Sequence, residues 1–117
     1  MTVMLETITP PESGPLDIDI KLTANIQVTP ETARRQVSVL VGNQIADLLH
    51  GERPDLVLRE DGAYWRVPVV LSSRSLGRIG SVGSIDVHVE TGELMITEQT
   101  MTEIEDRAQR FAVGTAL

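Results

Sequence analysis

The chain has 117 residues, of which 41% are hydrophobic and 23% are charged, and its formal net charge at pH 7 is -7. This composition is that of one globular domain, and it excludes both wholesale disorder and a bilayer-spanning apolar segment. The lack of cysteine excludes disulfides and thiolate chemistry. The acidic balance disfavours nucleic acid and anionic lipid as partners, because their phosphate groups would be repelled. No export signal is visible, so a cytoplasmic address is expected.

The N-terminal part combines a flexible segment with a strong strand pattern. Residues 1–15 contain three prolines and a glycine among polar residues, which predicts a flexible arm. In residues 18–28 every even position is apolar or small and every odd position is polar. This alternation is the period of a half-buried strand, so we expect residues 18–28 to form one.

A long helix is predicted to start at Thr29-Pro30-Glu31 and to extend to His50. Thr29 is a suitable N-cap, Pro30 suits the first helical position, and Glu31 complements the helix dipole. Apolar residues then recur every three or four positions up to a glycine that follows the segment. The apolar stripe is expected to pack against a sheet.

A series of strands should follow this helix. Residues 55–59 read as a short strand, and Asp61-Gly62 is a hairpin signal leading into a strand over residues 63–71. Trp65 lies on the more apolar face of that strand and is expected in the core. Pro68 cannot donate a hydrogen bond, so its position requires a sheet edge or a bulge.

The last third of the chain contains a second hairpin and a helix. Residues 72–81 are polar and glycine-containing, which predicts a mobile loop. Residues 82–96 alternate apolar and polar side chains around a turn at Gly92, which predicts a hairpin. After a polar connector at 97–102, the apolar spacing predicts a short helix.

These segments together predict an α+β fold, in which the long helix packs on an antiparallel meander sheet in the order β-α-β-β-β-β-α. A single domain is expected over residues 16–113. It is preceded by the flexible arm of residues 1–15 and followed by a frayed C-terminus at residues 114–117.

Asp86, His88 and Glu90 form the one candidate metal or proton-transfer cluster, because they share one face of the predicted hairpin. Neighbouring same-face residues on a strand are nearly 7 Å apart, however, so we expect a solvated polar face, no metal and no cofactor. Neither a nucleophile elbow nor a phosphate-binding glycine motif occurs. An enzyme is therefore not expected.

Six residues are candidates for contact with a partner. Within residues 72–81, two arginines and two glycines can present hydrogen-bond donors to a phosphate or an acidic protein surface. The plainer alternative is a hydrophilic connection. The GXXG match in this segment lies between predicted strands, whereas the KH loop joins two helices. Two further arginines start the long helix and can equally be ordinary helix exterior. The candidates are Arg74, Gly77, Arg78, Gly80, Arg34 and Arg35.

The segment from residue 30 to residue 97 resembles PepSY-type domains. The resemblance is carried by the helix, by the strand Gly62-Ala63-Tyr64-Trp65-Arg66-Val67-Pro68-Val69, and by the run from Ile85 to Leu94 with its Thr91-Gly92-Glu93 turn. It implies a protein-binding or regulatory module, for which peptidase inhibition is the usual proposed role. Most such domains are extracytoplasmic, and residues 18–28 lie outside the pattern.

The chain is also similar, more faintly, to small acidic proteins encoded beside PIN-domain ribonuclease toxins. We therefore expect a non-enzymatic interaction module that binds a protein partner and can form a homodimer through an exposed strand. The alternatives are an acidic antitoxin-like partner of a PIN-domain nuclease and a small ligand- or metal-binding protein. Residues 18–28 and the arginine-containing loop are the expected contact surface.

Overall fold

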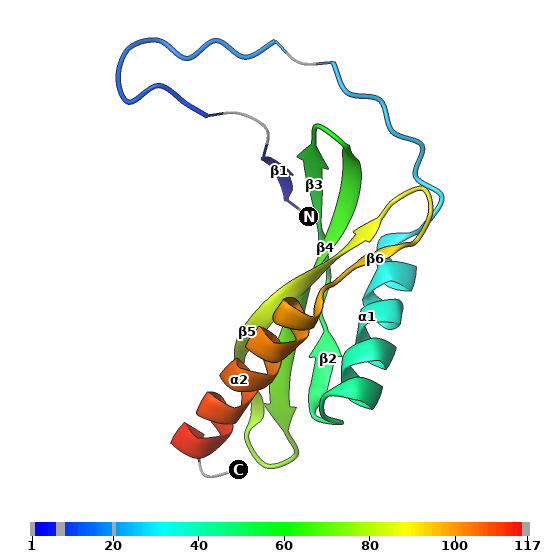
Figure 1. The fold of residues 1–117 in the computed structure, drawn as a ribbon, viewed down its shortest axis with the longest axis vertical. Coiled ribbons are helices and arrows are strands. Elements are labelled where there is room, and N and C mark those ends of the chain that lie inside the picture. Colours follow the sequence, from blue (N-terminus) through cyan, green and yellow to red (C-terminus); the bar gives the residue numbers. More distant parts are fainter. Residues whose placement is uncertain (1, 7–8, 20, 116–117) are drawn as a thin grey trace.

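The computed structural model describes residues 2–6, 9–19 and 21–115 and confirms the α+β class (Figure 1). One sheet has the strand order β1-β3-β4-β5-β6, and β2 also pairs with β4. The β1–β3 pair is parallel, and the other pairs are antiparallel. The elements are β1 (Val3–Leu5), α1 (Pro30–Gln44), β2 (Leu49–Gly51), β3 (Asp55–Arg59), β4 (Gly62–Ser73), β5 (Gly77–His88), β6 (Leu94–Met95) and α2 (Glu98–Thr115).

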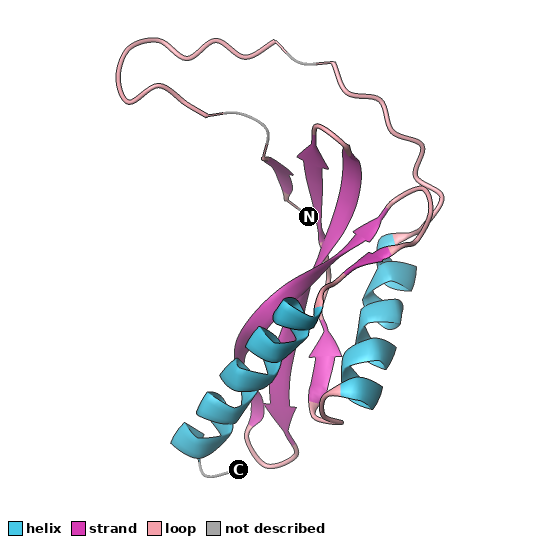
Figure 2. Ribbon diagram, in the orientation of Figure 1, coloured by secondary structure: helices cyan, strands magenta, loops and turns pink. Residues whose placement is uncertain are grey.

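One hydrophobic core joins the sheet to both helices. Figure 2 shows α1 beside β2 and α2 lying along β5, the longest strands crossing between them. The alternation predicted for β4 and β5 is confirmed, because alternate side chains of both strands enter this core. Its members include Trp65, Val67 and Val69 of β4, Ile85 and Val87 of β5, Ala33, Val37 and Val41 of α1, and Ile104 and Ala108 of α2.

Helix α1 begins as predicted and ends early. The Thr29 side chain accepts a hydrogen bond from the Thr32 amide at 3.1 Å, as an N-cap does. The helix stops at Gln44 instead of His50, because Leu49–Gly51 leaves it to pair with β4. Gly51 is required there: a Cβ atom would lie 2.8 Å from Val67 Cγ1.

The strand predicted at residues 18–28 is wrong. Residues 17–19 and 21–27 have no regular secondary structure, and Ile20 lies outside the described residues. Conversely, Val3–Leu5 lies within the expected flexible segment but pairs with β3 as strand β1. Alternation gives a segment one apolar face that can be buried, but a strand also needs the edge of a neighbouring strand to pair with. Within the described chain, β1 takes the outer edge of β3.

The mobile loop predicted at residues 72–81 is also wrong, because β4 and β5 continue through most of it. Ser73 pairs with Gly77, so only residues 74–76 form the turn. Gly77 has φ +70°, which glycine adopts without strain. The segment is polar because the β4–β5 hairpin is largely exposed at this end. A polar, glycine-containing sequence fits an exposed hairpin end as well as a loop.

Pro68 lies at a break in the sheet, as its missing donor requires. Strand β3 pairs with β4 only as far as Arg66, and β2 pairs with β4 from Val69 onward. Between them the Pro68 carbonyl accepts a hydrogen bond from the Glu52 amide at 2.9 Å. The ring nitrogen faces the same side, where no strand needs a donor.

Helix α2 is longer than the predicted short helix. It starts at Glu98, directly after Thr97, whose side chain accepts a hydrogen bond from the Thr100 amide at 3.1 Å. The helix packs closely on β5 over two glycines. A Cβ at Gly83 would lie 2.9 Å from Ile104 Cγ1, and one at Gly80 would lie 3.0 Å from Phe111 Cζ. Residues 114–115 remain helical, whereas 116–117 lie outside the described residues.

Candidate functional site

The most unusual surface feature is the extended segment of residues 9–27. It is called the arm from here on, and its bounds differ from those of the flexible arm predicted at residues 1–15. Figure 1 shows it leaving the sheet after β1 and returning at the start of α1. Its described residues are all exposed, including large apolar side chains at alternating positions. These are Leu16 at 54%, Ile18 at 52%, Leu22 at 48% and Ile26 at 50% exposure.

The C-terminal end of the arm is fixed to the body of the domain. The Gln27 and Val28 amides both donate to the Val89 carbonyl at 2.9 Å. The Trp65 indole donates to the Val28 carbonyl at 2.7 Å. The arm therefore joins the body of the domain beside the core tryptophan, and the C-terminal end of its alternating segment is held in place.

An ion-pair network fixes the chain just before the arm. Arg66 donates to Glu6 at 2.7 Å and to Asp86 at 2.9 Å, and Arg59 pairs with the same two carboxylates. Hydrogen bonds from Arg66 and Arg59 lower the pKa of Glu6 to about 2. The same carboxylates raise the pKa of Arg66. The network joins β1 to the sheet, so both ends of the arm are held.

A second unsatisfied surface runs along β5. Strand β6 pairs only with Asp86 and Val87. From Gly77 to Ile85, β5 pairs with β4 on one side, and among the described residues no strand pairs with its other side. This stretch, here called the open β5 edge, presents backbone donors and acceptors for a further strand.

The predicted cluster of Asp86, His88 and Glu90 does not assemble into a metal site. The solvated polar face expected for these residues is wrong at Asp86, which is 6% exposed and is held by two arginines. His88 Nδ1 accepts a hydrogen bond from the Glu90 amide at 3.1 Å, and the Glu90 carboxylate accepts one from the Asn25 amide at 3.1 Å. In the part of the chain that the structure describes, no three histidine or acidic side chains are grouped to hold a metal ion.

The predicted arginines are dispersed, and most are paired. Arg34 and Arg35 both bind the Glu31 carboxylate on α1. Arg78 pairs with Glu52 at 3.0 Å, whereas Arg74 is exposed at the hairpin turn. The two candidate glycines have structural roles, Gly77 in the turn and Gly80 beneath the Phe111 ring. The structure therefore brings no arginine cluster together from these six residues.

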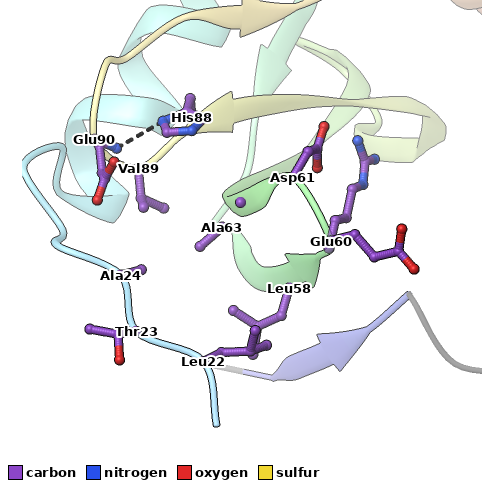
Figure 3. A pocket seen from close by; sticks show the side chains of 12 residues that line it. Leu22, Thr23, Ala24, Leu58, Glu60, Asp61, Ala63, His88, Val89 and Glu90 are labelled. Atoms are coloured by element: carbon purple, nitrogen blue, oxygen red, sulfur yellow. Dashed lines mark hydrogen bonds between the residues drawn. The ribbon is translucent and has the colours of Figure 1, made fainter. Parts of the chain in front are cut away.

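A small cavity lies between the arm and the end of the sheet (Figure 3). Its volume is about 240 Å³, and it is lined by residues 22–24 of the arm, by residues 58–63, where β3 turns into β4, and by residues 88–90. In Figure 3, Leu22 lies next to Leu58, and His88 and Glu90 lie across from them. Because the arm forms one wall, movement of the arm would open the cavity.

Sequence reasoning missed the open β5 edge. The sequence gives no direct signal for this edge. Strand β6 is too short to cover a strand as long as β5, and only the observed pairing shows this. No helix among the described residues is long and apolar enough to cross a membrane. Comparison of the chain with protein-family models, curated proteins and solved structures found no match.

Proposed function

We propose that this protein is a non-enzymatic interaction module that binds a protein partner by adding its arm to a partner's sheet. The observation that supports this most strongly is the exposure of alternating apolar side chains in residues 16–26. An extended segment with one apolar face contributes backbone hydrogen bonds to a sheet edge and buries that face in the same step.

The way in which the arm is held favours this role. The chain is fixed at Glu6 before the arm and at Val28 after it, and the Asn25 amide donates to Glu90, whereas residues 9–19 and 21–24 make no backbone hydrogen bond within the described chain. A segment held at both ends loses less conformational freedom on binding than a free tail does. Its unpaired backbone groups are in water until a partner edge replaces that water.

The layout of the domain is compatible with the regulatory role that the PepSY resemblance implies. Helix α1 packs on the sheet, Trp65 is in the core, and Gly92 with φ +76° forms the turn after β5. We extend the proposal to regulation of an enzyme, with a peptidase as the first class to test. The arm would supply the contact that the PepSY pattern itself lacks.

The test is affinity capture from the source cell with the full chain as bait. Leu22→Asp places a charge on the apolar face of the arm, and Thr23→Asp places the same charge on the neighbouring exposed position. We expect partner recovery with the wild-type chain and Thr23→Asp, and loss of recovery with Leu22→Asp. Equal recovery with all three baits would refute binding through the arm.

A second candidate is an acidic partner that shields a PIN-domain ribonuclease. It is favoured by three exposed acids on the arm, Glu12, Asp17 and Asp19, which suit a basic nucleic-acid-binding cleft. A nuclease reading frame beside this one, whose purified product loses RNA cleavage when this protein is added, would support it. Unchanged cleavage at saturating protein would exclude it.

A further inference from the structure

We propose that the arm of one copy adds as a strand to the open β5 edge of a second copy, and that the exchange is reciprocal. This inference rests on the proposed role of the arm as an added strand, and it names one sheet edge that the arm can join, that of a second copy of this chain. One chain carries both the unpaired segment and the unpaired edge, so two copies can satisfy each other through two equivalent contacts. Reciprocal contacts close a twofold dimer and leave neither surface free to propagate a fibre.

The hydrogen-bonding pattern of β5 identifies a residue whose backbone groups face outward. The Val89 amide donates to the Ala63 carbonyl, so this pair is hydrogen-bonded, and antiparallel pairs alternate along a ladder. Counting along the unbroken register, the Ser84–Pro68 pair is then not hydrogen-bonded. The Ser84 amide and carbonyl therefore point to the open side, where an added strand would meet them.

The two segments have similar lengths, and both carry apolar surface. The arm alternates over residues 17–27, and the open edge runs from Gly77 to Ile85, with register shifts against β4 between Gly83 and Ser81 and between Gly80 and Arg78. On the helix-covered side of this edge, Ile79 is partly buried, and Phe111 keeps 37% of its surface exposed above Gly80. An added strand can extend the core past β5 by placing its apolar face beside these side chains.

One cation lies close enough to the open edge to attract an acidic strand. The chain has a net charge of -7, and α2 carries exposed acids at Glu103, Glu105 and Asp106 besides Arg107, which has no ion pair among the described residues. Arg107 lies over β5, since its guanidinium is 3.9 Å from a Cβ built at Gly83. The arm carries acids, Glu12, Asp17 and Asp19, so its approach to this edge is attractive.

The position of the arm favours a second copy over the same chain. Both ends of the arm are held near the β3–β4 turn and the end of β5, by Glu6 and by Val28. The open edge starts beyond β6 and runs toward the opposite end of the sheet, where the β4–β5 turn lies (Figure 1). The arm would have to pass β6 and double back to reach its own edge, whereas the edge of a neighbour can approach the arm directly.

Sedimentation velocity of the purified full chain over a wide range of concentration tests the proposal. We expect a concentration-dependent dimer for the wild type. Leu22→Asp on the arm and Ser84→Pro on the edge should each raise the dimer dissociation constant at least about tenfold. Thr23→Asp and Ser84→Ala are the matched controls and should leave it within about twofold.

A monomer at every concentration, or a dimer that both Leu22→Asp and Ser84→Pro leave intact, would overturn the exchange. Circular dichroism and thermal melting report whether the fold is retained. If Ser84→Pro unfolds, Leu22→Asp still decides, because the arm lies outside the core. A monomeric wild type that captures another protein through Leu22 would overturn the self-pairing while keeping the proposed interaction function, so the two failures are distinguishable.

Discussion

The carboxylate of Asp86 should contribute to stability, because two arginines surround it in a largely buried position. Asp86 is 6% exposed, and it accepts hydrogen bonds from Arg66 at 2.9 Å and from Arg59. Breaking a fully buried ion pair costs about 3 to 5 kcal/mol. The two arginine side chains are 24% and 32% exposed here and keep Glu6 as a partner. We therefore expect Asp86→Ala to lower the free energy of unfolding by about 2 kcal/mol.

Urea unfolding followed by circular dichroism measures this change, with Glu105→Ala as the control. Glu105 is an exposed acid of α2 that has no ion pair among the described residues. Its removal should change the free energy of unfolding by no more than about 0.5 kcal/mol. If Asp86→Ala is no more destabilising than Glu105→Ala, the ion-pair network does not stabilise the sheet.

The lowered pKa of Glu6, from 4.5 to about 2, stabilises the fold above pH 4.5, and this stabilisation is lost as the pH falls through about 2; Glu6→Gln should flatten that part of a plot of urea midpoint against pH, and an unchanged slope would contradict it. Gly42→Ala should stabilise the protein by up to about 1 kcal/mol, because the added Cβ would meet only a carbonyl oxygen at 3.8 Å. Gly51→Ala should destabilise it by about 1 to 3 kcal/mol, because the added Cβ would lie 2.8 Å from a valine methyl. Equal effects of the two substitutions in urea unfolding would refute the packing argument. Trp65→Phe removes the indole hydrogen bond to the end of the arm and should lower stability by about 1 kcal/mol while speeding amide exchange in residues 25–28; unchanged exchange would show that the indole does not hold the arm.

The sequence was most informative where neighbouring residues decide the structure. The N-cap at Thr29 depends on a side chain and an amide three positions apart, and it was predictable. The buried faces of β4 and β5 follow from alternation alone, which placed Trp65 and Ile85 in the core. The predictions were wrong for elements whose structure depends on partners far away in the sequence. Leu49 fits a helical stripe as well as a strand, and its pairing with Leu71 selects the strand.

The arm illustrates the same limit at the candidate site. Alternation gives residues 18–28 one apolar face in the sequence, but it carries no information about whether a sheet edge lies beside them, and the predicted strand does not form. Likewise, Asp86 was identified as a candidate ligand, while its actual partners depend on the register that places it opposite Arg66. Side chains that share a strand face can be predicted from sequence, whereas the residues across from them require the fold.

If the arm is an unpaired strand, it should become ordered when it meets a sheet edge. Amide hydrogen exchange of residues 17–27, followed by mass spectrometry in dilute and in concentrated solutions of the full chain, tests it most directly. We predict rapid exchange in the dilute monomer and slowed exchange at concentrations where sedimentation shows the dimer. Equally rapid exchange in the fully associated protein, or protection already present in the dilute monomer, would show that the arm does not pair with a sheet edge on association.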